Sequence, residues 1–95
     1  MLVVVAFIEL DIEFFQSLKD KRQVVRSLKD RLRNSFNVSA NEVGLQDVHQ
    51  RARLAVSFVA HDNAFADATL EKIEKFVDST TDAVLAEFTF DKIEY

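Results

Sequence analysis

The stretch RARLAVSFVAH at residues 51–61 alternates side chains with a period of two, which is the pattern of a half-buried β-strand. One predicted face carries Ala52, Leu54, Val56, Phe58 and Ala60. The other face carries Arg51, Arg53, Ala55, Ser57 and Val59. This is the clearest strand in the chain, and the remaining predicted elements flank it in a regular order.

On the N-terminal side, residues 38–47 predict a weaker strand with Gly44 as a candidate bulge, and residues 47–50 predict a turn. Residues 2–12 predict another strand, because β-branched residues dominate and apolar residues alternate with acids from Ile8 onward. Between these strands, Ser17 predicts the N-cap of a helix that ends near Asn34 or Phe36.

On the C-terminal side, Asp62 or Asn63 predicts the cap of a second helix, followed by a turn at residues 79–82 and a last strand at residues 83–93. The predicted apolar face of this helix comprises Phe65, Thr69, Leu70, Ile73, Phe76 and Val77.

The order strand, helix, strand, strand, helix, strand, with right-handed crossovers, predicts an α+β ferredoxin-like β-α-β-β-α-β sandwich. Its four-stranded antiparallel sheet would carry both helices on one face, and the 95 residues would form a single domain at residues 1–95. The first and third strands are neighbours in this topology, so Glu9 and Asp11 should lie near Arg53 and Arg51.

Composition excludes several classes of function. The chain has no cysteine and only one glycine, which excludes thiol chemistry, cysteine metal sites and glycine-rich phosphate loops. His49 and His61 each lie near an aspartate, but nothing places a nucleophile or a third orienting group beside them. We expect no catalytic residue, metal, cofactor or small-molecule substrate.

The N-terminal residues 1–7 are apolar but lack the basic flank and cleavage site of a signal peptide. No apolar run approaches the length of about 20 residues that spans a bilayer. The sequence therefore predicts a cytoplasmic protein without a membrane partner.

Positive charge concentrates between Ser17 and Phe36 in a chain whose net charge is −4. Seven of the twelve Lys and Arg residues lie there, and five fall within an arc of about 80° on the helix. We call these five the basic strip: Lys19, Arg22, Arg26, Lys29 and Arg33. The strip spans about 21 Å along the helix axis, enough to follow several phosphates. Lys21 should instead lie near the apolar face with its ammonium reaching solvent.

Three interpretations of the basic strip remain open: a solvated face without a partner, a nucleic-acid interface and a contact with an acidic protein. The second helix carries an acidic stripe that could meet the strip within or between subunits. This acidic stripe comprises Asp67, Glu71, Glu74 and Asp78.

We do not expect RNA bases to stack on the open face of the sheet. Phe58 should point to the helices, and Phe7 is the one aromatic candidate on the central strands. The same face offers an apolar surface for a homodimer, with candidate residues Val3, Val5, Val59 and Leu85. The turn before the third strand is either a recognition turn or a hydrogen-bonded connector. Its candidate residues are Gln46, Asp47, His49, Gln50 and Arg51.

Three segments resemble the YlxP-like family of small bacterial proteins of unknown function. They are SLKDKR at residues 17–22, RLRNSFNVS at residues 31–39, and QD at 46–47 followed by QRA at 50–52. His49 stands where the family pattern often has an aromatic residue. The motif residues that the resemblance carries onto the first helix are Ser17, Lys19, Lys21, Arg22 and Arg33.

The resemblance implies a ferredoxin-like fold, dimers and a bacterial cytoplasmic setting. Family genes often lie among those for transcription elongation, translation initiation and ribosome maturation, which implies a role near RNA or the small ribosomal subunit. We therefore expect a non-enzymatic protein that contacts RNA or the ribosome through its basic first helix. The alternative is a dimeric protein-interaction module with an acidic protein partner.

Overall fold

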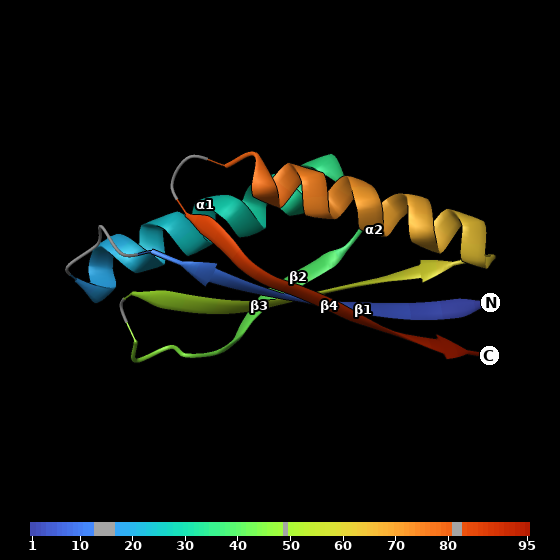
Figure 1. Cartoon of the computed structure of the whole chain (residues 1–95), viewed down its shortest axis with the longest axis horizontal. Coiled ribbons are helices and arrows are strands. Elements are labelled where there is room, and N and C mark those ends of the chain that lie inside the picture. Colours follow the sequence, from blue (N-terminus) through green and yellow to red (C-terminus); the bar gives the residue numbers. More distant parts are fainter. Residues whose placement is uncertain (13–16, 49, 81–82) are drawn as a thin grey trace.

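The computed structural model describes residues 1–12, 17–48, 50–80 and 83–95. The elements in chain order are β1 (Leu2–Asp11), α1 (Leu18–Ser35), β2 (Ser39–Gly44), β3 (Arg51–Ala60), α2 (Asn63–Asp78) and β4 (Val84–Glu94). The strands form one antiparallel sheet in the order β2-β3-β1-β4, and both helices cover the same face of it (Figure 1). The predicted ferredoxin-like sandwich is confirmed.

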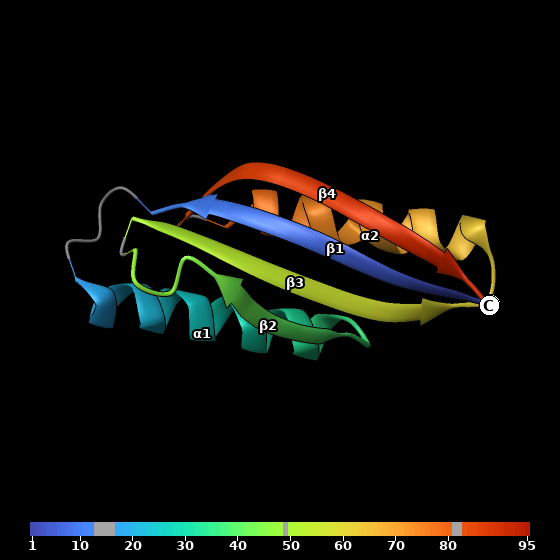
Figure 2. The same cartoon turned by 90° about the horizontal axis from the view of Figure 1, so that it is seen from below.

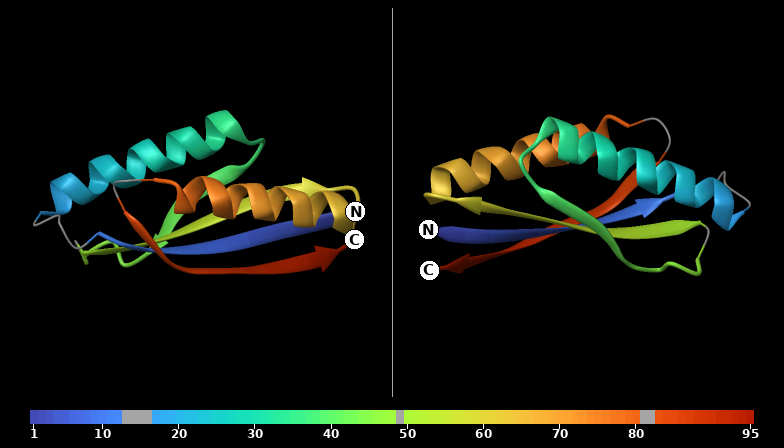
Figure 3. Two further views of the ribbon diagram at one scale, coloured as in Figure 1. Left: turned by 45° about the horizontal axis from the view of Figure 1, so that its top comes forward. Right: turned by 180° about the vertical axis from the view of Figure 1, so that it is seen from behind.

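The core lies between the sheet and the two helices. Alternate residues of β1 and β3 are buried, among them Val4, Ile8, Leu54 and Val56, and the side chains between them face the open side of the sheet. Phe58 is buried towards the helices, as its position in the alternating pattern predicts. Figure 3 shows from two further directions that no helix of the described residues covers the opposite face of the sheet.

The pairing of β1 with β3 confirms the predicted charge register. Glu9 lies opposite Arg53, and Asp11 lies opposite Arg51. Opposite charges directly across a ladder favour one register over its alternatives. The two ends of the chain also meet, because the Tyr95 amide donates to the Met1 carbonyl at 2.8 Å (Figure 1).

A register shift between β1 and β4 corrects one prediction. Glu9 pairs with Glu87, whereas Leu10 pairs with Leu85, so Ala86 is an extra residue in β4. One extra residue reverses the face of the side chains that precede it. Leu85 therefore lies against the core, and its predicted place on the open face is wrong.

Other differences from the predicted elements are local. β2 is shorter than predicted, and its register with β3 shifts between Glu42 and Gly44, next to the predicted bulge. Phe65 is exposed, and Ala66 takes the buried position in the first turn of α2. In the described part of the chain, no helix is long and apolar enough to cross a membrane.

Candidate nucleic-acid interface

The helix α1 presents the basic strip to solvent. Its buried side is formed by Val25, Leu28 and Leu32 together with Lys21. Ser17 caps the helix as predicted, since its hydroxyl accepts a hydrogen bond from the Asp20 amide at 3.2 Å. Four of the five strip residues are exposed, and Lys29 is half-buried.

Contacts at the C-terminal end of α1 show which way the basic strip faces. The guanidinium of Arg33 donates a hydrogen bond to the Ala40 carbonyl of β2, and it lies 3.7 Å from the Asp30 carboxylate. Because the five strip residues share one arc of the helix, the strip faces the β2 edge of the sheet. Apart from Arg33, no strip residue forms an ion pair with a carboxylate of the described residues.

The acidic stripe of α2 faces the opposite edge of the sheet. Its Asp67 forms an ion pair with Lys92 of β4, and β4 is the edge strand farthest from β2. Figure 2 shows the same arrangement from below, with α1 beside β2 and α2 beside β4. The possibility that strip and stripe meet within one chain is therefore excluded for the described residues.

The structure places Lys21 differently from the sequence prediction. Its side chain does not reach solvent, because the residue is only 1% exposed. The ammonium donates hydrogen bonds to the carbonyls of Leu45 and Val48, and it forms an ion pair of 3.0 Å with Glu42. Burial of a lysine is tolerated here because three oxygen atoms surround its charge.

Lys21 joins the helix to the predicted recognition turn. The carbonyls that it binds flank Gln46 and Asp47, whose side chains are exposed. The turn closes with a hydrogen bond of 3.0 Å from the Val48 amide to the Leu45 carbonyl, and Leu45 has a positive φ of 62°. The backbone of the turn is thus held by hydrogen bonds, and the exposed side chains of Gln46 and Asp47 lie near the N-terminal half of α1.

The remaining turn residues differ in whether their side chains are free to contact a partner. Gln50 is exposed, and His49 lies outside the described residues. Arg51 forms ion pairs with Glu9 at 3.3 Å and with Asp11 at 3.7 Å. Arg51 is therefore engaged in pairing β3 with β1.

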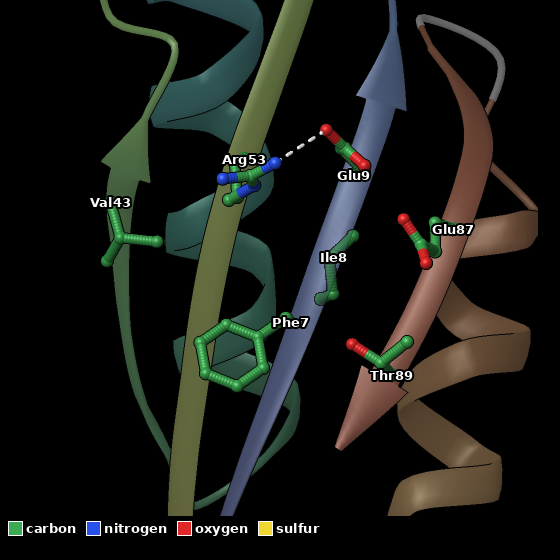
Figure 4. Close-up of a pocket in the computed structure, with 7 residues that line it drawn as sticks. All are labelled: Phe7, Ile8, Glu9, Val43, Arg53, Glu87 and Thr89. Carbon is green, nitrogen blue, oxygen red and sulfur yellow. Dashed lines mark hydrogen bonds and ion pairs between the residues drawn. The ribbon is translucent and has the colours of Figure 1, made fainter. Parts of the chain in front are cut away.

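A shallow cavity of about 430 Å³ lies on the open face of the sheet. Figure 4 shows its lining residues, which are Phe7, Ile8, Glu9, Val43, Arg53, Glu87 and Thr89. The Arg53 guanidinium donates to Glu9 at 3.0 Å, and this hydrogen bond is the main cause that lowers the pKa of Glu9. Because the basic strip and this cavity lie on different faces, they are separate surfaces.

The open face also carries the predicted dimer candidates Val3, Val5 and Val59. Val3 pairs with Val59 on one side and with Ile93 on the other. Phe7 and Ile93 are exposed on the same face, and the sequence prediction did not include them in the apolar surface. The pairing of β1 with β4 adds Ile93 to that surface.

The ion pair between Lys21 and Glu42 was also missed by the sequence prediction. A signal for it exists in β2, where Glu42 shares a face with the buried Ala40. An acidic residue on the inward face of a strand requires a partner. The sequence does not show which cation supplies it.

Comparison with known proteins places the chain in a family. The family described as "Protein of unknown function (DUF503)" matches residues 3–90. The chain is also similar to the "Uncharacterized protein YlxP" of Bacillus subtilis (strain 168), with 36% identity over 63 residues. That match covers 66% of this chain and 68% of the Bacillus protein.

Proposed function

The chain belongs to the DUF503 family of proteins of unknown function, and we propose that it is a non-enzymatic protein that binds structured RNA. The basic strip of α1 is the binding surface. The physiological target is RNA of the small ribosomal subunit, in ribosome maturation or translation in the bacterial cytoplasm.

The placement of the basic strip is the observation that carries the proposal. Lys19, Arg22, Arg26 and Lys29 have no ion pair with a described carboxylate, so their charge is not neutralised by that part of the chain. Arginine suits phosphate because its planar fork donates two hydrogen bonds to one group. An unneutralised row of such side chains favours a polyanion over an uncharged partner.

The net charge of −4 does not oppose this proposal. The acidic stripe lies beside β4, three strand spacings from β2, which is a distance of about 14 Å. Screening in physiological salt acts over about 8 Å. The strip therefore acts as a local positive surface, although the whole chain is acidic.

The exposed turn adds polar groups beside the strip. Gln46 and Asp47 offer amide and carboxylate groups near the N-terminal half of α1, and Gln50 is exposed at the end of the same turn. Phosphate contacts position a nucleic acid, whereas polar side chains at its bases or sugars distinguish one site from another. In this proposal the strip supplies affinity and the turn supplies selectivity.

The salt dependence of binding tests the proposal. Purified small ribosomal subunits and a fluorescent RNA hairpin would each be titrated with the protein over a series of salt concentrations. Engagement of about four phosphates predicts a log–log slope of roughly −3 to −4. No binding at low salt, or binding that is indifferent to salt, would contradict the proposal.

A dimeric protein-interaction module is the second candidate function. The observation in its favour is the apolar half of the open face, where Val3, Val5 and Val59 lie beside exposed Phe7 and Ile93. We propose that a second copy of the chain covers this surface. In this alternative the basic strip then contacts an acidic protein, and a complex with that protein would survive nuclease treatment.

A further inference from the structure

Along the outer side of the edge strand β4, no strand of the described residues pairs with the backbone groups. Met1 and Tyr95 exchange hydrogen bonds in both directions, at 2.8 and 3.3 Å. In an antiparallel ladder such pairs alternate with pairs whose amides and carbonyls point away from each other. The backbone groups of Phe88, Phe90 and Lys92 therefore point outward from the sheet.

The side chains of these three residues lie on the helix-covered face, next to α2. There a groove of about 240 Å³ has an apolar floor and an acidic wall. Its floor is formed by Leu70, Phe88 and Phe90, and its wall by Asp67, Glu71 and Glu74. An added strand would thus meet backbone hydrogen-bonding groups, aromatic rings and carboxylates together.

Lys92 shows how this groove holds a cation. Its ammonium forms an ion pair with Asp67, donates a hydrogen bond to the Asn63 side-chain oxygen at 3.2 Å, and lies 5.7 Å from the centre of the Phe90 ring. The stem of a long basic side chain packs on an aromatic surface while its charge reaches a carboxylate. Of the other wall residues, Glu71 pairs with Lys75, and Glu74 has no ion pair with a described residue.

Charge decides which occupant fits the β4 edge. Pairing with β4 of a second copy would place two acidic stripes side by side, and RNA would be repelled by the same carboxylates. On the open face, β4 also presents Glu87 and Asp91. Both faces of an added strand would therefore meet acidic side chains.

We propose that the β4 edge and its groove bind an extended basic segment of another protein by adding it to the sheet as a fifth strand. Arginine or lysine at alternate positions would lie over Phe88 and Phe90 and reach the carboxylates of Glu71 and Glu74. Backbone hydrogen bonds supply affinity in this mode, and the side-chain groove supplies selectivity. This surface lies at the opposite edge from the basic strip, so the two proposals stand independently.

A synthetic peptide of alternating arginine and threonine tests the proposal. In a ¹⁵N-labelled sample, the peptide should shift the amide signals of Phe88, Phe90 and Lys92 and leave those of Arg22 and Arg26 unchanged. The variant Glu71→Gln/Glu74→Gln should weaken binding by roughly tenfold, the equivalent of two exposed charge pairs. The control Asp30→Asn/Asp47→Asn removes the same charge at the β2 edge and should weaken binding less than twofold.

Two N-methylated peptides separate strand addition from simple charge attraction. One carries methyl groups on the amides of the arginines, and the other carries them on the amides of the threonines. In an added strand, the amides of alternate residues point to opposite sides, so only the arginine amides or only the threonine amides point towards β4. One methylated peptide should therefore bind and the other should not, whereas equal affinities of the two would overturn the proposal.

Discussion

Lys21 is the residue whose observed environment differs most from the sequence prediction. A lysine within a basic helix suggests a solvated charge, yet this one is buried between α1, β2 and the turn that precedes β3. It carries no exposed charge for a partner and instead holds the turn against the helix. Its place in the family motif is therefore explained by structure, whereas Lys19 and Arg22 in the same motif remain exposed.

Replacing Lys21 tests this structural role. Lys21→Met keeps the length of the side chain but leaves two carbonyls and Glu42 without their cation. We expect a loss of about 2–4 kcal/mol in the free energy of unfolding, measured by urea denaturation. Lys19→Met, at an exposed site on the same helix, should change stability by less than about 0.5 kcal/mol. Equal effects of the two substitutions would show that the buried contacts contribute little.

Glu9 links stability to pH. Its pKa is lowered, first by the hydrogen bond from Arg53, so the folded state favours the ionised carboxylate. That contribution is fully present above the ordinary Glu pKa of about 4.3 and is lost as the pH falls through the lowered value. Wild type should therefore be more stable than Glu9→Gln at pH 7, and the difference should shrink towards pH 3. A stability difference between wild type and Glu9→Gln that stays the same from pH 7 to pH 3 would contradict this role of Glu9.

Among the elements, both helices begin where local sequence chemistry predicts. Ser17 accepts from the Asp20 amide, and Asp62 accepts from the Phe65 amide at 2.8 Å. These caps depend on residues within one helical turn, so they are readable without knowledge of the fold. The alternating pattern of β3 is readable for the same reason.

Removing the caps should destabilise the helices to a similar extent. Ser17→Ala and Asp62→Ala are each expected to cost about 1 kcal/mol, within a range of about 0.5–2 kcal/mol. Ser27→Ala changes an exposed serine inside α1 and should leave stability unchanged or raise it by up to about 0.5 kcal/mol. Thermal or urea unfolding measures all three, and a loss for Ser27→Ala as large as that for Ser17→Ala would refute the capping role.

Features that depend on distant residues were not readable from the sequence. The extra residue Ala86 reverses the face of Leu85, and nothing in the apolar pattern of β4 marks that bulge. The burial of Lys21 depends on Glu42 and on two carbonyls more than twenty residues away in the chain. Local periodicity predicts which residues lie on the same face of an element. It does not predict which residues of other elements contact them.

For the whole molecule, the main finding is the separation of charge across the sheet. The sequence predicts a basic strip and an acidic stripe, but which edge each one faces depends on how the helices rotate against the sheet. Contacts of Arg33 with β2 and of Asp67 with β4 place them at opposite edges. The molecule therefore presents a positively charged surface at one edge of the sheet and a negatively charged surface at the other.

The proposed homodimer is a third surface, on the open face. Val59 is 60% exposed on the apolar part of this face. The substitution Val59→Lys would therefore place a charge within the interface without disturbing the core. We expect wild type to elute as a dimer and Val59→Lys as a monomer in size-exclusion chromatography with light scattering. The control is Lys72→Glu, which changes the charge of an exposed residue on α2, away from the open face, and should leave the dimer intact. A monomeric wild type at high concentration would exclude the proposed interface.

Charge reversal on the two helices tests whether the basic strip is the surface that binds RNA. The variants Arg22→Glu/Arg26→Glu and Lys72→Glu/Lys75→Glu change the net charge equally, the first in the basic strip and the second on α2. Binding to the same RNA hairpin would be measured at one salt concentration, with circular dichroism to confirm that both variants are folded. We expect the RNA affinity to fall by roughly tenfold or more for the strip variant and by less than about threefold for the α2 variant. Equal losses for the two variants, or no loss for the strip variant, would contradict it.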